Sequence, residues 1–245
     1  MKALRLAELS WIELKKLIDE GLDTVFVPVG TVEAHGKHLP LGTDFYIAER
    51  IAEIMCSKVG GVMAPTVPYG VTRSLIGYPG SLTLTSNTFK LLIKEVAVAL
   101  GRKGFKFIIF VNGHGGNTDY IKEAIREAYL EVGVKGVLVD WWIAAKSVIE
   151  KHYPVGHGHA LAEETAALMA TRPDLLKREL YDEEDYVTYQ EGFWAYPLPA
   201  SALAYKKEKP EIDFDLDKAI KFLNEVGEYL ANEVKRVIEK WRKIG

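Results

Sequence analysis

A three-layer α/β/α sandwich with a mainly parallel sheet, folded as a single domain over residues 1–245, is the structure that the sequence predicts. Short apolar runs alternate along the chain with segments whose apolar residues recur at helical spacing. The run FKFIIFV is apolar at every position except Lys106, as expected of a strand buried on both faces of a parallel sheet. A length of 245 residues suits one large domain.

The predicted elements follow one another in a regular order. Ser10 and Glu13 have the spacing of a capping box, which predicts a helix from there to about Glu20. Further helices are predicted where apolar residues recur at helical spacing, at about 45–58, 87–100, 118–132, 160–171 and 216–241. Strands are predicted at 24–29, 62–67, 105–111 and 137–142. The aromatic stretch 181–213 is predicted to be irregular.

The composition argues against several classes of protein. A formal net charge of −3 argues against nucleic-acid binding, which leaves a basic surplus in the sequence. Cys56 is the only cysteine, so the chain cannot form an intrachain disulfide. The first residues carry acids and lack the apolar stretch of a signal peptide, and the longest apolar runs are too short to cross a bilayer. We therefore expect a cytoplasmic protein with neither a nucleic-acid nor a membrane partner.

Metal-ligating residue types follow two of the predicted strands. The stretch GTVEAHGKHLPLGTD, directly after the first of them, holds Glu33, His35 and Asp44, and His114 follows FKFIIFV. Parallel sheets bind ligands beyond the carboxyl ends of their strands, so these side chains are expected at one edge of the sheet. Imidazole nitrogen with carboxylate oxygen is the ligand set of zinc, manganese and iron(II) sites.

A third glycine-rich segment, GHGHALAEE, adds His159 and two acids. His159 and Glu163 are four residues apart and are expected on one helix face, with Glu164 one residue further round. The three glycine-rich segments together hold five of the chain's six histidines, which are His35, His38, His114, His157 and His159. This clustering favours a metal or catalytic centre.

Purely structural interpretations of the same residues remain open at this point. A carboxylate beside a histidine in a loop can be a simple hydrogen bond. NGHGGN can be a strand-to-helix turn that uses the conformational freedom of glycine, or a phosphate site at a helix N-terminus. Nucleophilic alternatives are weaker, because the chain has no G-x-S-x-G motif and Cys56 lies within a predicted helix.

Three motifs in the same order resemble the creatininase (creatinine amidohydrolase) family over about residues 25–171. They are VPVGTVEAHGKHLPLGTD, VNGHGGN and GHALAEET. The resemblance implies an amidohydrolase with two divalent metal ions on an α/β/α fold, commonly assembled as a hexamer. It implies that Glu33 and His114 hold one ion, that His35 holds the other, and that Asp44 bridges them. His159 and Glu164 match the histidine and the acid of the family's third motif.

Two departures from creatininase itself bear on the substrate. Creatininase has a tyrosine and a metal-binding acid after the metal histidine, and these positions are Gly115 and Gly116 here. Glu164 is therefore expected to replace the missing ligand of the second ion. Ser74 and Leu75 stand where relatives often carry an acid–histidine pair. HGGN resembles instead an archaeal branch that removes a formyl group from a formamidopyrimidine nucleotide.

These residues can be given roles in amide hydrolysis. His159 or Glu164 is expected to protonate the leaving nitrogen as a general acid. The N–H groups of Gly115 and Gly116 are expected to bind the substrate oxyanion, and Arg73 a phosphate group on the substrate. His38 is a candidate for orienting a ligand. Two asparagines, Asn112 and Asn117, are expected to brace the turn.

The function predicted from the sequence is metal-dependent hydrolysis of a non-peptide amide, with a formamide as the specific expectation. The two ions are expected to be zinc, iron(II) or manganese. Creatinine hydrolysis, a peptidase of the same family, and a non-catalytic metal- or nucleotide-binding protein are the alternatives. The resemblance and the apolar character of 181–213 further predict a homo-oligomer, with the hexamer as the implied assembly.

Overall fold

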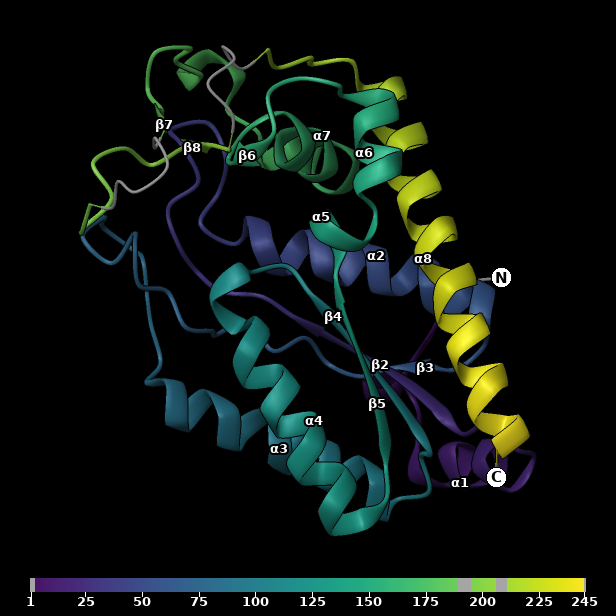
Figure 1. The fold of residues 1–245 in the computed structure, drawn as a ribbon. Coiled ribbons are helices and arrows are strands. Elements are labelled where there is room, and N and C mark those ends of the chain that lie inside the picture. Colours follow the sequence, from purple (N-terminus) through teal and green to yellow (C-terminus); the bar gives the residue numbers. More distant parts are fainter. Residues whose placement is uncertain (1–2, 189–194, 206–210, 245) are drawn as a thin grey trace.

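The computed structural model describes residues 3–188, 195–205 and 211–244. Its centre is a five-stranded sheet with the order β1-β3-β2-β4-β5, and every pair in it is parallel (Figure 1). The strands are β1 (Leu4–Arg5), β2 (Thr24–Val29), β3 (Val62–Met63), β4 (Phe107–Asn112) and β5 (Lys135–Asp140). The predicted mainly parallel sheet is therefore confirmed.

Helices cover both faces of this sheet. They are α1 (Trp11–Asp19), α2 (Thr43–Val59), α3 (Ser86–Arg102), α4 (Thr118–Val132), α5 (Trp141–Ala144), α6 (Lys146–His152), α7 (Ala162–Thr171) and α8 (Leu216–Ile244). Single turns of 3-10 helix lie at Leu6–Glu8, Gly115–Asn117, Pro173–Leu175 and Arg178–Leu180. In Figure 1, α3 and α4 lie on one side of the sheet, and α2 and α8 on the other.

Alternating side chains of the central strands fill two separate hydrophobic layers. In β2, Val25 and Val27 belong to the layer that also contains Phe89 of α3, whereas Phe26 belongs to the layer with Phe222 of α8. All of these side chains are fully buried. Burying one phenylalanine side chain contributes about 1.5–3 kcal/mol, so both helical layers hold the sheet firmly. The three-layer arrangement and single domain predicted from the sequence are thus confirmed.

Several predicted boundaries are wrong by a few residues. The strand predicted at 62–67 ends at Met63, two residues before Pro65, which lacks the N–H of a ladder hydrogen bond. The strand predicted at 137–142 starts and ends two residues earlier, and Trp141 already begins α5. The helix predicted at 45–58 begins at Thr43, which places Asp44 in its first turn.

The segment around His159 also differs from its prediction. Helix α7 begins at Ala162, and His159 lies in the short strand β6 (Gly158–His159). The predicted common helix face of His159 and Glu163 is therefore wrong. The physical reason is that β6 pairs with β8 (Leu203–Ala204), and Ala160 then turns the chain with a φ of 59°.

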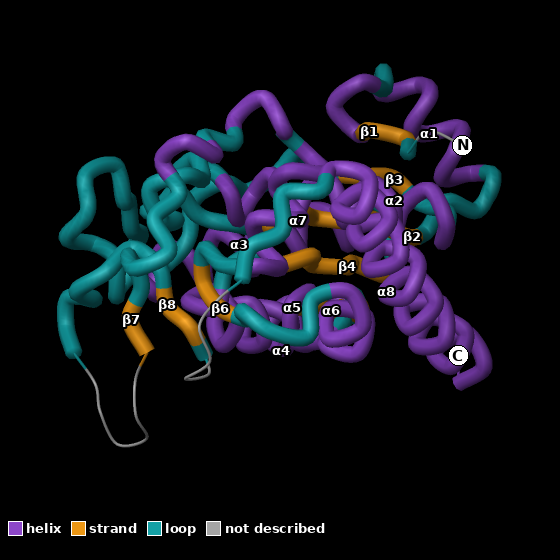
Figure 2. The backbone as a smooth tube through the Cα atoms, turned by 90° about the horizontal axis from the view of Figure 1, so that it is seen from above, coloured by secondary structure: helices purple, strands orange, loops and turns teal. Residues whose placement is uncertain are grey.

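The aromatic stretch 181–213 is less irregular than predicted. Its described residues include β7 (Val187–Thr188) and β8, which form a three-stranded sheet with β6. Figure 2 shows this small sheet at the end of the molecule opposite the C-terminal end of α8. Tyr189, Phe193 and Trp194 lie outside the described residues. Among the residues that are described, no helix is both long and apolar enough to cross a membrane.

Candidate active site

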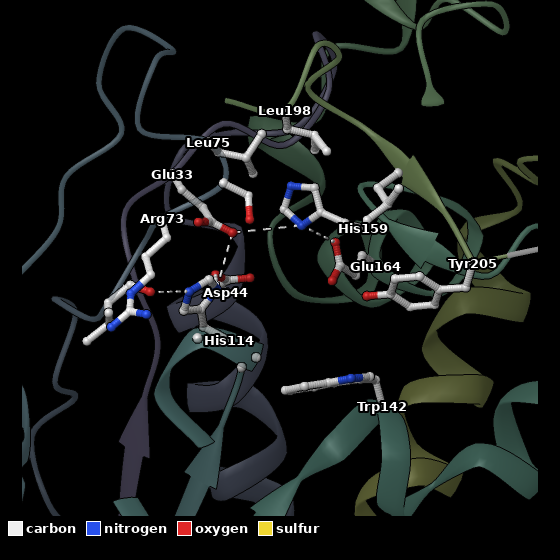
Figure 3. Close-up of a pocket in the computed structure, with 16 residues that line it drawn as sticks. Glu33, Asp44, Arg73, Leu75, His114, Trp142, His159, Glu164, Leu198 and Tyr205 are labelled. Atoms are coloured by element: carbon white, nitrogen blue, oxygen red, sulfur yellow. Dashed lines mark hydrogen bonds and ion pairs between the residues drawn. The ribbon is translucent and has the colours of Figure 1, made fainter. Parts of the chain in front are cut away.

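The candidate ligands converge beyond the carboxyl ends of β2 and β4. The loop after β2 carries Glu33 and His35, and His114 follows β4 directly. Asp44 comes from the first turn of α2, and Glu164 from the first turn of α7. Figure 3 shows Glu33, Asp44, His159 and Glu164 turned toward one another on one wall of a pocket. The predicted convergence at this edge of the sheet is therefore observed.

Asp44 is the central residue of this cluster. Its Oδ1 atom lies 2.8 Å from Nε2 of His35, and its Oδ2 atom lies 3.2 Å from Nδ1 of His114. The same nitrogen of His114 lies 3.2 Å from Oε1 of Glu33. Oε2 of Glu164 lies 3.8 Å from Nε2 of His35. The two oxygens of one carboxylate thus face two different histidines.

In each of three histidines, His35, His114 and His159, one ring nitrogen is hydrogen-bonded to a backbone carbonyl. Nδ1 of His35 bonds to the carbonyl of Glu33 at 3.0 Å, and Nε2 of His114 bonds to that of Val71 at 3.1 Å. Nε2 of His159 bonds to the carbonyl of Ala34 at 2.8 Å. A carbonyl only accepts hydrogen bonds, so these nitrogens carry the proton. The opposite nitrogen, which faces the carboxylates, is the one that can bind a cation.

Burial and ion pairing compete in this cluster. Burial favours the neutral form of Asp44, but His35 and His114 outweigh it and hold the pKa of Asp44 well below its usual value. At Glu33, burial raises the pKa, but the charge of His114 outweighs it and lowers the pKa. At His35, burial lowers the pKa, but Asp44 outweighs it and raises the pKa to about 10. At Glu164, burial dominates and raises the pKa. A divalent cation would take over the positive charge that the histidines supply, and would release their protons.

The donor atoms fit a pair of divalent cations. Glu33, Asp44 and His114 offer ligand atoms within 4.8 Å of one another, and so do His35, Asp44 and Glu164. Asp44 belongs to both groups, as a bridging ligand must. Its Oδ2 atom is buried without a hydrogen-bond partner, which is costly unless a cation satisfies it. A third combination, of Glu33, His35 and His159, reuses residues of the first two.

The pocket in front of this cluster has a volume of about 310 Å³. Its remaining walls come from other segments, with Leu75 and Leu198 on one side and Trp142 on the other (Figure 3). Tyr205, next to β8, also lines it, and Figure 3 shows the hydroxyl group of Tyr205 pointing toward Glu164. Leu75 stands at the position where relatives often carry an acid–histidine pair. The roles of Leu198, Trp142 and Tyr205 were not predicted, because their place in the pocket depends on the fold rather than on a local motif.

The predicted substrate-binding residues Gly115, Gly116 and Arg73 also line the pocket. A Cβ atom at position 116 would lie 2.2 Å from the carbonyl oxygen of Val71, so no side chain fits there. At position 115 a Cβ atom would meet only a ring carbon of Trp142, at an ordinary contact distance of 3.7 Å, so a side chain can start there without a clash. In this chain a metal-binding acid at position 116 is therefore sterically excluded.

Arg73 stands at the exposed rim of the pocket. Its guanidinium donates to the Tyr120 hydroxyl at 2.6 Å and lies 5.8 Å from the centre of that ring. Tyr120 belongs to α4, which follows His114 after the single 3-10 turn at Gly115–Asn117. The arginine is thus held at the rim of the pocket that the acidic cluster also lines.

The remaining polar residues of the motifs have structural contacts. Asn117 is fully buried and bridges the carbonyl of Gly30 and the N–H of Val71, while Asn112 bonds to the carbonyl and the N–H of His114. Both asparagines therefore brace the turn, as expected. His38 bonds to the hydroxyl of Thr165 at 2.9 Å and so ties the ligand-bearing loop to α7. It makes no hydrogen bond to a candidate ligand in the described structure.

Comparison with known proteins identifies the family. A family model described as creatininase, creatinine amidohydrolase, matches residues 7–207. The chain belongs to the creatininase family. Its relatives include the mycofactocin precursor peptide peptidase of Mycolicibacterium smegmatis, 34% identical over 159 residues, which cover 61% of this chain and 58% of the relative. The creatinine amidohydrolase of Pseudomonas putida is 26% identical over 193 residues, covering 71% of this chain and 74% of the relative.

Solved structures of creatininase have the same fold. One superposes with a TM-score of 0.85 at 22% identity, covering 96% of this chain and 98% of the other. Two more are described as an Mn creatininase and as a Zn–Zn type of a creatininase mutant. The family model confirms the creatininase family predicted from the three motifs, and the relatives are named as hydrolases or peptidases. The formamidopyrimidine branch stays a prediction.

Proposed function

We propose that the chain hydrolyses a C–N bond of a non-peptide amide with the help of two divalent cations (zinc, manganese or iron(II)). Glu33, Asp44 and His114 would hold one cation, and His35, Asp44 and Glu164 the other. The observation that carries this proposal is the shared carboxylate of Asp44, whose two oxygens face two different histidines. Each of those histidines is already anchored through its opposite nitrogen.

Bound cations of this kind lower the pKa of water to near neutrality and polarise a carbonyl oxygen. The protein side chains supply the proton transfers. Nδ1 of His159 faces the pocket and lies 3.8 Å from both Glu33 Oε1 and Glu164 Oε2. His159 accepts a proton from the attacking water and delivers it to the leaving nitrogen, while the two acids stabilise the imidazolium.

The pocket supports a substrate larger than creatinine. Position 115 lines the pocket and carries no side chain, which leaves more room for a bulkier amide beside the cluster than a tyrosine there would. Arg73 at the rim supplies a charge for an anionic group such as a phosphate. A formamide of a nucleotide, as in formamidopyrimidine deformylation, has both properties and is our specific proposal for the substrate.

Metal analysis and a substrate panel test the proposal together. Protein purified without chelators or affinity metal is expected to carry two divalent ions per chain. Chelation is expected to abolish hydrolysis of a formamidopyrimidine nucleotide, and divalent metal to restore it, with little turnover of creatinine. A fully metal-loaded protein that hydrolyses no amide would contradict the activity, and efficient creatinine turnover would contradict the substrate.

A peptidase is the second candidate function. It is favoured by the 34% identity to a peptide peptidase, compared with 26% to the creatinine amidohydrolase. The same cluster can act on a peptide bond, because a peptide is also an amide. Short peptides in the substrate panel separate the two candidates, since a deformylase is expected to leave them intact.

We also propose that the chain assembles as a homo-oligomer. Large apolar side chains such as Trp11, Leu130 and Tyr196 are 74%, 83% and 57% exposed in the single chain. Aromatic side chains are typical interface anchors. Sedimentation is expected to give a mass above 27.4 kDa, and a monomer at micromolar concentration would contradict this proposal.

A further inference from the structure

Glu163 is a buried acid that takes no part in the chemistry described above. It is 3% exposed and lies in the first turn of α7. Its neighbour Glu164 lines the pocket, whereas Glu163 is not among the lining residues. Its Oε1 atom accepts the backbone N–H of Gly158 at 3.0 Å. Its Oε2 atom lies 3.9 Å from Nδ1 of His157 and has no hydrogen-bond partner in the described structure.

The two adjacent acids hold the backbone on either side of His159. Glu163 accepts the N–H of Gly158, the residue before His159. Glu164 accepts the N–H of Ala160, the residue after His159, at 2.6 Å. The imidazole itself donates to the carbonyl of Ala34 at 2.8 Å. Three hydrogen bonds therefore fix both the backbone and the ring of His159.

The position of the Gly158 backbone depends on the hydrogen bond from its N–H to Glu163. A Cβ atom there would lie 2.0 Å from the carbonyl oxygen of Leu203, so the strand packs directly against β8 at this point. Gly158 itself is buried. A buried N–H group without an acceptor is costly, and an apolar side chain at position 163 would offer none. Losing the carboxyl group would thus release the strand that carries His159.

We propose that Glu163 is a positioning residue, which fixes the His159 imidazole in the pocket by holding the Gly158 N–H. The inference rests on the proposed function in that His159 carries the proton. Glu163 binds neither substrate nor cation. Its loss is therefore expected to reduce the rate of proton transfer and to leave both substrate affinity and metal content in place.

The kinetic test compares Glu163→Leu with Glu163→Gln. Leucine has a similar size but no acceptor, whereas glutamine keeps an oxygen for the Gly158 N–H. On the amide that the wild-type chain hydrolyses, Glu163→Leu is expected to lower kcat at least tenfold with KM within twofold. Glu163→Gln is expected to keep kcat within about twofold. Equal losses in both variants, or none in either, would overturn the proposal.

Thr171→Val is the matched control. Thr171 lies in the last turn of the same helix, and its hydroxyl donates to the Ala167 carbonyl at 2.7 Å. The variant loses this side-chain hydrogen bond but no contact of His159 or of a candidate ligand, so its kcat is expected to stay within twofold. Should Glu163→Leu fail to fold, Glu163→Met replaces it, because a flexible thioether side chain fits irregular buried gaps. A tenfold loss in Thr171→Val would show that any disturbance of α7 has the same effect, and would overturn the specific role.

Nitrogen NMR of the histidine rings tests the positioning without a substrate. With His159 assigned by comparison with His159→Gln, the wild-type ring is expected as a single tautomer with the proton on Nε2. Glu163→Leu is expected to give an average of two tautomers, and Glu163→Gln the wild-type pattern. If no amide is hydrolysed, the proposed function fails while this spectrum still decides the inference. An unchanged His159 signal in Glu163→Leu would overturn it.

Discussion

The backbone of Gly113 lies so close to Asp44 that a Cβ atom at position 113 would be 2.1 Å from the Asp44 carbonyl oxygen. Gly113 is the single residue between the end of β4 and His114, and Asp44 lies in the first turn of α2. Glycine at this position therefore lets strand and helix approach closely enough for His114 to reach the carboxylate of Asp44.

Gly113→Ala is expected to separate these two elements. The added methyl group meets backbone on its nearest side, which cannot move without shifting α2, and overpacking of this kind costs about 1–3 kcal/mol. Urea unfolding is expected to show the loss, and metal analysis a reduced ion content. Gly115→Ala is the control, because its Cβ would meet only Trp142 at 3.7 Å. Equal effects at both positions would contradict the explanation.

Asp44→Asn is expected to remove both ions at once. The amide keeps the shape of the side chain but loses the negative charge that would bridge two cations. Breaking a buried charge pair also costs about 3–5 kcal/mol, which unfolding of the metal-free protein should reveal. Asp140→Asn is a suitable control, since Asp140 bonds to Asn112 at 2.7 Å but is outside the candidate ligand groups. Retention of one ion in Asp44→Asn would show that this residue does not bridge.

Glu164→Gln separates a ligand from a general acid. If Glu164 holds the second ion, the variant is expected to keep one ion per chain, because Glu33, Asp44 and His114 are unchanged. Metal analysis of the purified protein gives the number directly. Two ions with lost hydrolysis would instead assign Glu164 to proton transfer alone.

Gly116→Ala and Gly115→Tyr probe the double glycine. The alanine Cβ would lie 2.2 Å from the Val71 carbonyl and 2.5 Å from Nε2 of His114, so loss of folding or of one ion is expected. The Cβ atom of a tyrosine at position 115 would meet only the Trp142 ring, at an ordinary contact distance of 3.7 Å, so the thermal midpoint is expected to stay within a few degrees. The tyrosine fills part of the pocket, however, and turnover of a nucleotide formamide is expected to fall at least tenfold. Undiminished turnover would argue against this side as the substrate space.

Cys56 is expected to be unreactive in the native protein. It is 2% exposed on α2, and burial raises the pKa of its thiol to about 11. Alkylation by iodoacetamide at pH 8 should be slow in the native state and fast in urea. Because α2 also carries Asp44, added divalent metal is expected to slow the reaction further. Rapid labelling of the folded protein would contradict the burial of this helix.

The long elements could be predicted from the sequence because their signals are local. The apolar run of strand β2 and the capping box at Ser10 each depend on residues within a few positions. The placement of Glu33, His35, Asp44 and His114 at one edge of the sheet could also be predicted. These residues follow predicted strands, and the carboxyl ends of parallel strands share an edge.

The remainder could not be predicted because it depends on contacts between distant segments. β6 has two residues and exists through its pairing with β8, so local periodicity around His159 indicated a helix instead. Trp142 and Tyr205 reach the pocket only after the fold is formed. Glu163 was noticed in the sequence as an acid four residues after His159. The direction of its side chain, however, depends on the residue at which α7 begins.

Helix α8 packs on α2 and α7, the helices that carry Asp44 and Glu164, yet it offers no ligand itself. It also follows every candidate ligand in the sequence. During synthesis, every candidate ligand therefore leaves the ribosome before the helix that fixes two of them. A nascent chain that already contains the whole set still lacks the support for its metal centre. We therefore expect the chain to capture its ions only after α8 has been synthesised, later than the last candidate ligand.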